Sequence, residues 1–288
     1  MNFIMSKDYC QPISTGVRAK LVFCRRRRII VATVGWWISA LTTVMVVNRM
    51  HEKISSAQNI LHLWFSRVSP ASLEIEHSLQ SMLSDSELNR LNSIGGKNRR
   101  REYLLSRALM RHALSQTFQR QDRDWSFIEL PDAAPVVSNL PKDTHISLSH
   151  SQGVICFAIS ALPLGVDLEA TEKQRDFSAL AQVFMNREEQ ARLRDNRSRQ
   201  TDYFYRVWSA KEACYKRLSA LQQSARSLSQ LRYSDLVENN SHGYLYQASI
   251  EGFVVAAMMA DRPQQVSAHF YLMQAQRLRD FNDGEIQA

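Results

Sequence analysis

Gly165-Val166-Asp167-Leu168-Glu169 is the stretch that decides the fold of this chain. Apolar and acidic side chains alternate along it, which is the pattern of a β-strand whose successive side chains project to opposite faces. Asp167 and Glu169 then share one face, while Leu168 points into a core. An apolar run at residues 154–159 and a short turn precede the stretch, so it is expected to form the second arm of a buried hairpin.

A second informative segment follows some forty residues later and reads Trp208-Ser209-Ala210-Lys211-Glu212-Ala213-Cys214-Tyr215-Lys216. In a helix, Glu212 and Lys216 are one turn apart and share a face. The two segments together bring three carboxylates and a lysine towards one place. Oxygen ligands of this kind suit a magnesium ion bound to phosphates. Taken separately, each segment is also typical of a solvated surface, as an acidic strand edge or a helical Glu–Lys pair.

Two further elements lie upstream in a fixed order. One is Ile146-Ser147-Leu148-Ser149-His150-Ser151, and the other is a helix expected over residues 97–118 that contains Leu104-Leu105-Ser106-Arg107-Ala108-Leu109-Met110-Arg111. In order and spacing, the four elements resemble the 4'-phosphopantetheinyl transferase superfamily, of the surfactin-synthetase-activating, holo-acyl-carrier-protein synthase-like type. The resemblance extends from about residue 61 into the 270s.

The resemblance implies an enzyme that needs Mg²⁺ and uses coenzyme A as co-substrate. Such enzymes transfer the 4'-phosphopantetheine arm to a serine of an apo acyl or peptidyl carrier protein and release 3',5'-ADP. By similarity, the metal ligands are Asp167, Glu169 and Glu212. Glu212 and Lys216 are the implied catalytic pair, one taking the serine proton and the other neutralising the departing phosphate. The implied coenzyme A contacts are Lys97, Arg111, Ser149, His150 and Lys211.

Several of these contacts have a plain structural alternative. Lys97, Arg100, Arg107 and Arg111 fall on one stripe of the expected helix, which is also how a solvated basic face looks. Lys211 is expected to face away from Lys216, towards phosphate or solvent. The sequence also departs from the family, because Ala134 stands where the family has a loop lysine and Ser147 where it has an asparagine. Both departures bear on coenzyme A affinity and neither changes the acidic residues.

Helices and strands follow one another in two similar sets, which predicts an α+β fold. The expected helices cover residues 85–91, 97–118, 177–193 and 201–221, and the expected strands cover residues 61–67, 243–250, 253–260 and 266–273. The resemblance implies a pseudo-dimer of two subdomains, each a small antiparallel sheet packed with helices, with the active site between them. The expected divisions are an extension at 1–56, subdomains at 57–160 and 161–276, and a tail at 277–288. A monomer is expected.

Charge is concentrated in the extension. The chain carries a net charge of +8, but residues 1–56 alone hold nine Lys/Arg and two acidic residues, so the remainder is nearly neutral. Nucleic-acid binding by the folded part is therefore not expected. The four cysteines have no paired or metal-binding spacing, which is typical of a reducing cytoplasm.

The extension contains an uncharged segment at residues 29–47, directly after Arg25-Arg26-Arg27-Arg28. Its length suits a membrane span, but the positive cluster before it would place the transferase region outside the cytoplasm, away from coenzyme A. The alternatives are a natural start at Met45 or Met50 and a buried or peripheral helix. A competing functional hypothesis is a catalytically degenerate, membrane-tethered protein that binds coenzyme A or a carrier protein. The cytoplasmic enzyme is the leading interpretation.

Overall fold

The computed structural model describes three strands in the extension and then residues 59–68, 73–130, 135–172, 175–195, 197–238 and 242–271. The strands are β1 (Cys10–Thr15), β2 (Ala19–Cys24), β3 (Ile29–Thr33), β4 (Ile60–Arg67), β5 (Phe127–Ile128), β6 (Val136–Val137), β7 (His145–Ser151), β8 (Val154–Ser160), β9 (Leu164–Ala170), β10 (Tyr244–Ile250), β11 (Phe253–Met259) and β12 (Gln265–Tyr271). The α-helices are α1 (Leu73–Gln80), α2 (Asp85–Ser93), α3 (Lys97–Phe118), α4 (Phe177–Phe184), α5 (Arg187–Asp195), α6 (Gln200–Arg217), α7 (Ala220–Ser224) and α8 (Tyr233–Val237).

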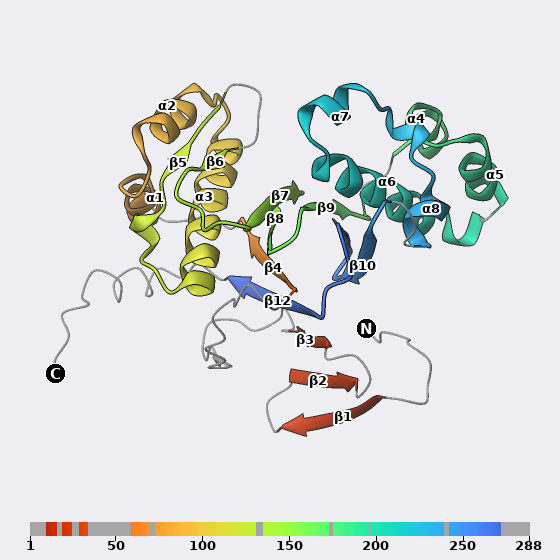
Figure 1. The fold of residues 1–288 in the computed structure, drawn as a ribbon, viewed down its shortest axis with the longest axis horizontal. Coiled ribbons are helices and arrows are strands. Elements are labelled where there is room, and N and C mark those ends of the chain that lie inside the picture. The colour runs from red at the N-terminus through yellow and green to blue at the C-terminus, as the bar shows by residue number, and fades with distance from the viewer. Residues whose placement is uncertain are drawn as a thin grey trace.

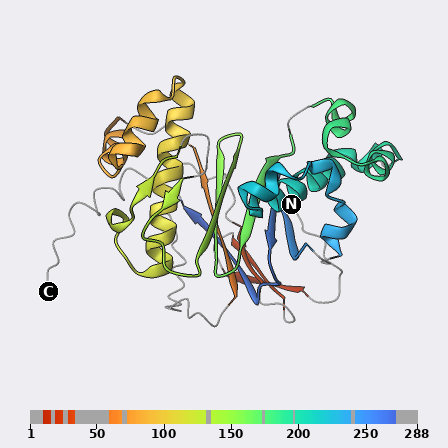
Figure 2. The ribbon, with the colours of Figure 1, turned by 45° about the horizontal axis from the view of Figure 1, so that its top comes forward.

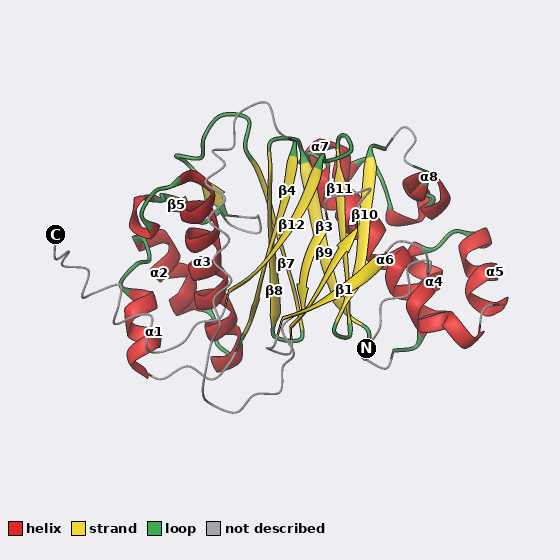
Figure 3. Cartoon of the chain, turned by 90° about the horizontal axis from the view of Figure 1, so that it is seen from below, coloured by secondary structure: helices red, strands yellow, loops and turns green. Residues whose placement is uncertain are grey.

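Two sheets lie between two sets of helices (Figure 1). The larger sheet has the strand order β1-β2-β3-β12-β4-β8-β7, and the smaller has the order β10-β11-β9. Helices α1 to α3 flank the sheets on one side, and α4 to α8 flank them on the other (Figures 1 and 2). Seen from below, the strands fill the middle of the molecule and the helices stand at its two ends (Figure 3). The α+β fold expected from the sequence is confirmed.

The alternating side chains of β8 explain this layering. Ile155, Phe157 and Ile159 pack in the core beneath α3. Cys156 and Ala158 point the other way, into the core between the two sheets. Because β8 is covered on both faces, all its residues are buried and its sequence is almost continuously apolar. Strand β11 does the same in the smaller sheet, with alternate residues facing the intersheet core and α6.

The hairpin prediction was wrong in its pairing. Strand β8 pairs with β4 and β7, whereas β9 pairs with β11. The actual hairpins are β7–β8, which turns at Gln152-Gly153, and β10–β11, which turns at Glu251-Gly252. All four turn residues have positive φ, as two-residue turns between right-twisted strands require. The chain leaves β8 for the other sheet, so its adjacency to β9 in sequence did not indicate a hydrogen-bonded pair.

Two expected helices end earlier than the sequence suggested. The helix expected over residues 177–193 is broken into α4 and α5, because Asn186 caps α5 and exchanges hydrogen bonds with Glu189. The motif helix α6 ends at Arg217 rather than at residue 221, where Ser219 caps the separate helix α7. In both places a capping residue within an apolar pattern restarts the helix.

The extension contributes strands to the larger sheet. Ile29–Thr33 form β3, which pairs in parallel with β12, so the segment at 29–47 begins as a strand. Residues 34–47 lie outside the described part of the chain, as do Ala134 and the tail at 277–288. Among the described residues, every helix is too short or too polar to cross a bilayer.

Each set of helices contains a buried ion pair at an equivalent position, between a glutamate near the start of one helix and a cation of the following helix. Glu87, third in the capping box of α2, accepts two hydrogen bonds from Arg111 of α3. Glu189, third after the cap of α5, accepts one from Lys211 of α6. The resemblance between the two halves supports the expectation of a pseudo-dimer, which stays a prediction. Strand β12 falls within the second expected subdomain in sequence, yet it pairs with β4 in the larger sheet.

Candidate active site

A glycine brings β9 close to the motif helix. A Cβ atom at Gly165 would lie 2.2 Å from the carbonyl oxygen of Ala213 and 2.6 Å from the backbone nitrogen of Arg217. These atoms are backbone and cannot move aside, so only glycine permits this approach. The close contact sets β9 beside the last turns of α6. It thereby places the acidic residues of the strand opposite Glu212 and Lys216.

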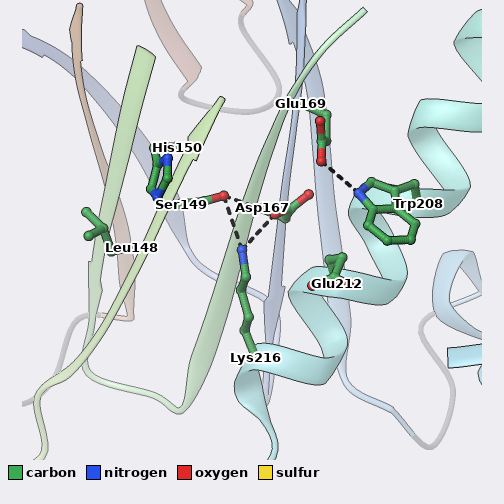
Figure 4. A pocket seen from close by; sticks show the side chains of 8 residues that line it. All are labelled: Leu148, Ser149, His150, Asp167, Glu169, Trp208, Glu212 and Lys216. Carbon is green, nitrogen blue, oxygen red and sulfur yellow. Dashed lines mark hydrogen bonds and ion pairs between the residues drawn. The ribbon is translucent and has the colours of Figure 1, made fainter. Parts of the chain in front are cut away.

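The side chains from β7, β9 and α6 line a cavity of about 380 Å³. Figure 4 shows them: Leu148, Ser149, His150, Asp167, Glu169, Trp208, Glu212 and Lys216. The structure thus brings together the three acidic residues, the lysine and the Ser-His pair that the sequence singled out. Their functional roles stay predictions.

Asp167 lies at the centre of this cavity and is 4% exposed. Its Oδ1 accepts hydrogen bonds from Lys216 Nζ at 2.7 Å and from Ser149 Oγ at 3.0 Å. Its Oδ2 is buried and has no hydrogen-bond partner among the described residues. A buried carboxylate oxygen without a partner carries a desolvation cost, and this one is available to a cation.

Glu169 is held by the indole of the motif helix. Trp208 Nε1 donates to Glu169 Oε1 at 2.7 Å, and Ser151 Oγ and Arg175 Nη2 approach Oε2 at 3.4 Å. Burial raises the pKa of the Glu169 carboxyl, and the charge of Asp167 raises it further. The bonds from Trp208, Arg175 and Ser151 act in the opposite direction.

Glu212 faces the same cavity from α6, half-buried. Among the described residues, none forms a hydrogen bond or ion pair with its carboxylate. Burial raises the pKa of Glu212, the charge of Asp167 adds to this, and Lys216 partly offsets it. A carboxylate with a raised pKa and no partner is a suitable proton acceptor.

The Ser-His pair is partly engaged within the protein. The Ser149 hydroxyl accepts hydrogen bonds from Leu168 N and Lys216 Nζ and donates one to Asp167 Oδ1. These three bonds use the full hydrogen-bonding capacity of the hydroxyl group. A phosphate contact would therefore require Ser149 to release one of these partners. His150 is more available, because its side chain is 57% exposed and only its Nδ1 is bound, 2.9 Å from Glu102 Oε1.

Two of the expected coenzyme A contacts lie elsewhere. Lys211 is fully buried and donates to Glu189 and to the carbonyl of Phe184, so the expectation that it faces phosphate or solvent was wrong. Arg111 is 2% exposed, forms its two bonds to Glu87 and stacks over the ring of Phe127. Neither side chain lines the cavity.

A second arginine of the basic stripe of α3 is also paired with carboxylates, and a third binds a backbone carbonyl. Arg107 pairs with Glu129 and Glu87, and Arg100 donates to the carbonyl of Leu91. Lys97, at the start of α3, is exposed and does not line the cavity. Lys97 and Arg111 are the two residues of this helix that the sequence predicted to contact coenzyme A, and of these only Lys97 has an accessible side chain.

The acidic residues suit magnesium by their chemistry rather than by a preformed cage. Within the described residues, no three His, Cys, Asp or Glu side chains converge closely enough to surround a metal ion. The three carboxylates nevertheless line one cavity, and one oxygen of Asp167 lacks a partner among the residues described. Burial, and then the charge of Asp167, raises the pKa values of Glu169 and Glu212. Mg²⁺ keeps several waters and binds through few carboxylates, so it does not need a closed protein cage.

Sequence reasoning missed some residues that contact the site. Trp208 lies in the segment that the sequence singled out, but its bond to Glu169 was not anticipated. Ser151 completes a Ser-x-Ser-x-Ser alternation that was visible in the sequence and was not used. Arg175 lies in a connection with no periodic pattern, so no signal in the sequence indicated its approach to Glu169.

Comparison with known proteins agrees with this geometry. Residues 163–257 match the family model described as the 4'-phosphopantetheinyl transferase superfamily. The chain is 29% identical over 147 residues to 4'-phosphopantetheinyl transferase Sfp of Bacillus subtilis (strain 168), which covers 51% of this chain and 65% of that protein. It is 30% identical over 149 residues to 4'-phosphopantetheinyl transferase ffp of Bacillus subtilis, with the same two shares. It is 32% identical over 116 residues to 4'-phosphopantetheinyl transferase psf-1 of Bacillus pumilus, covering 40% of this chain and 49% of that protein.

The chain matches just under two thirds of the length of the first two relatives. The matched family range contains β9, α6 and most of β11, which together carry the acidic residues and Lys216. With these elements inside that range, this part of the chain is similar to the 4'-phosphopantetheinyl transferase superfamily, in its Sfp-like type.

Proposed function

We propose that this chain transfers the 4'-phosphopantetheine arm of coenzyme A to a serine of an apo acyl or peptidyl carrier protein. The serine oxygen forms a new bond to the phosphorus that carries the pantetheine arm. The bridging P–O bond of the pyrophosphate breaks, and 3',5'-ADP leaves. The single observation that carries the proposal is the cavity in which Asp167, Glu169, Glu212 and Lys216 meet within a region matched by the family.

The reaction requires a proton acceptor and a cation near the leaving phosphate. Glu212 suits the first role, because its carboxylate has no hydrogen-bond or ion-pair partner among the described residues and burial raises its pKa. It takes the proton of the serine hydroxyl as the new bond forms. Lys216 suits the second role, because its side chain is 31% exposed and its ammonium group reaches Asp167 in the cavity. It neutralises charge on the departing phosphate.

Mg²⁺ belongs to the same proposal, with Asp167, Glu169 and Glu212 as its ligands. When bound, it would neutralise the negative charge of the pyrophosphate. The protein's own contribution is to hold three carboxylates on two elements that Gly165 brings into contact. His150 and Lys97 are the accessible groups proposed to bind the phosphates of coenzyme A.

Because coenzyme A is a cytoplasmic metabolite, we also propose the cytoplasm as the site of action. A monomer is proposed with it.

The test is an intact-mass measurement of apo carrier proteins after incubation with the full chain, coenzyme A and Mg²⁺. We expect a mass increase on the order of 340 Da, which is lost on chelation and in Asp167→Ala, because that change removes a proposed ligand of the Mg²⁺ that would neutralise the phosphates. Asp202→Asn is the matched control, since Asp202 lies on α6 but pairs with Arg206 on the exposed side.

Coenzyme A binding without transfer to any carrier would instead favour the degenerate binding protein. Normal transfer by Asp167→Ala would show that the metal assignment is wrong.

A further inference from the structure

Three serines of β7 form a regular set of hydrogen bonds to β9. The hydroxyl oxygen of Ser147 accepts from Val166 N at 2.9 Å. Ser149 accepts from Leu168 N and Ser151 from Ala170 N, each at 3.1 Å. Each bond joins residues 19 apart, so the contacts advance along both strands in step.

These bonds take the place of a backbone ladder between the two sheets. Strand β7 makes its backbone pairs with β8, and β9 makes its backbone pairs with β11, so each strand is the edge of its own sheet. In an antiparallel strand, alternate N–H groups point away from the partner. Without the serines, three buried N–H groups of β9 would face β7 unpaired, and buried backbone donors almost always have an acceptor.

The alternation of β7 makes this arrangement possible. Ile146 and Leu148 pack against the core beneath α3, so the intervening serines must face the opposite side, towards β9. The small serine side chains let β7 and β9 approach closely. Each serine hydroxyl oxygen lies within hydrogen-bonding distance of one N–H group of β9. The serines recur at every second residue of β7, and the N–H groups of β9 that point away from β11 also recur at every second residue, so the two sets match.

The ladder holds the backbone on either side of the acidic residues. Asp167 lies between the anchored amides of Val166 and Leu168, and Glu169 lies between those of Leu168 and Ala170. A slip of one residue would turn both carboxylates away from the cavity, because successive side chains of a strand face opposite sides.

We propose that Ser147, Ser149 and Ser151 form a side-chain ladder that fixes the register of β9 on β7, with Ser147 as a positioning residue for the carboxylates. The positioning role rests on the proposed function, whereas the ladder itself does not. Ser147 is the cleanest member for a test, because it does not line the cavity and its hydroxyl bonds to the backbone of Val166 alone among the described residues.

The ladder is tested by amide hydrogen exchange of the full chain without coenzyme A or metal. In Ser147→Ala, exchange at Val166 should be at least about tenfold faster, because the N–H loses its acceptor. Ser147→Thr keeps a hydroxyl and suits a strand, so it should restore slow exchange. Ser160→Ala is the control, because Ser160 also accepts a hydrogen bond from a backbone N–H, that of Leu162, but lies at the far end of β8.

A second substitution guards against a variant that does not fold. Ser147→Cys preserves the volume but offers a weaker acceptor, so it should give a smaller increase in exchange at the same amide. Unchanged exchange at Val166 in folded Ser147→Ala or Ser147→Cys would overturn the ladder. These measurements do not require transfer activity, so they stand even if the proposed function fails.

The positioning role is tested by the Mg²⁺ dependence of transfer. Ser147→Ala should raise the Mg²⁺ concentration for half-maximal rate and lower kcat at least about tenfold, and Ser147→Thr should rescue both. A purely structural role would change the fraction of folded protein and leave the Mg²⁺ half-saturation unaltered. That second result would overturn the positioning role while leaving the ladder intact.

Discussion

Lys216 Nζ lies 2.7 Å from Oδ1 of Asp167, while the other oxygen of the same carboxylate is buried and has no hydrogen-bond partner in the described part of the chain. One side of Asp167 is thus neutralised by α6, and the other faces the cavity shared with Glu169 and Glu212. Three carboxylates with one lysine leave excess negative charge in a half-buried space. Such an arrangement costs stability in the unliganded protein and favours binding of a cation.

The first prediction concerns the cost of this charge. Asp167→Asn should leave the thermal midpoint unchanged or raise it in the absence of Mg²⁺. Burial raises the pKa of both Glu169 and Glu212, and the charge of Asp167, which the variant removes, raises it further. Adding Mg²⁺ should raise the midpoint of the wild type and have little effect on the variant, since ligand binding stabilises only the form that binds it. Thermal unfolding with and without Mg²⁺ checks both. A large loss of stability in Asp167→Asn alone would mean that the carboxylate is structural.

Much of this site could be predicted from local patterns. The bounds of α3 agree with the expectation over residues 97–118, and β9 and α6 carry the acidic residues that were assigned to them. Strand alternation and helical spacing are local properties, and they determine which side chains share a face. The alternation in Gly165–Glu169 therefore indicated the correct face before the neighbouring helix was known.

The errors concern contacts between distant residues. Arg111 and Lys211 look like accessible cations in sequence, but their partners lie 24 and 22 residues upstream, at the start of the preceding helix. A glutamate in the third position of a helix is a usual capping residue. Nothing in its own neighbourhood indicates that it will also bind a cation from the next helix. The missed pairing of β9 with β11 has the same cause, since five α-helices and strand β10 lie between the two strands in the described sequence.

A second prediction tests the indole contact to Glu169. Trp208→Phe removes the Nε1 donor but keeps an aromatic ring to pack edge-on against Phe184. The Mg²⁺ concentration for half-maximal transfer should rise by about 10-fold to 100-fold, as is typical when the partner of a metal ligand is lost. The loss of the bond should also raise the pKa of Glu169 further. Metal titration of the transfer rate measures the effect.

Trp125→Phe is the matched control for that substitution. The Trp125 indole donates to Ser115 Oγ at 2.9 Å, so its replacement by phenylalanine also removes an indole hydrogen bond. Trp125 lies in the core beneath α3, away from the cavity. It should lose about 1 kcal/mol of stability without any change in Mg²⁺ dependence. Equal shifts in the two variants would indicate a general loosening of the fold.

A third prediction separates the two cations of α3. Arg111→Met should lower the free energy of unfolding by about 3 kcal/mol or more, because Glu87 would stay buried without its main partner. Lys97→Met should change it by less than about 0.5 kcal/mol, since Lys97 is exposed. Lys97→Met should instead raise the KM for coenzyme A. Urea unfolding and steady-state kinetics measure these quantities.

The double variant Glu87→Gln/Arg111→Met provides the check on that interpretation. Removing both charges should recover part of the stability lost by Arg111→Met, because no unpaired carboxylate is left in the core. If Arg111→Met were stable and had a raised KM for coenzyme A, Arg111 would be a coenzyme A contact rather than a structural residue.

The last prediction concerns two histidines on the adjacent strands β4 and β12. His62 Nδ1 and His269 Nε2 lie 3.4 Å apart, and the ring of His269 stacks on Trp64. Burial lowers the pKa of each from 6.5 to about 4, with a further contribution from His269 at His62 and from His112 at His269. The folded chain therefore keeps both rings neutral at pH values where the unfolded chain binds protons. Their contribution to stability is complete above pH 6.5 and is lost as the pH falls from 6.5 towards 4.

The free energy of unfolding should therefore fall between about pH 7 and about pH 5, by up to about 1.4 kcal/mol per pH unit for each histidine. His62→Gln/His269→Gln should flatten this dependence, because glutamine does not titrate. His77→Gln is the control, since His77 is exposed on α1 and its replacement should leave the slope unchanged. Urea unfolding of the three proteins across this pH range measures the pH dependence of the free energy of unfolding. An equal pH dependence in the wild type and the double variant would show that His62 and His269 do not cause it. Agreement would locate the acid sensitivity of the fold where the opening strand β4 meets β12.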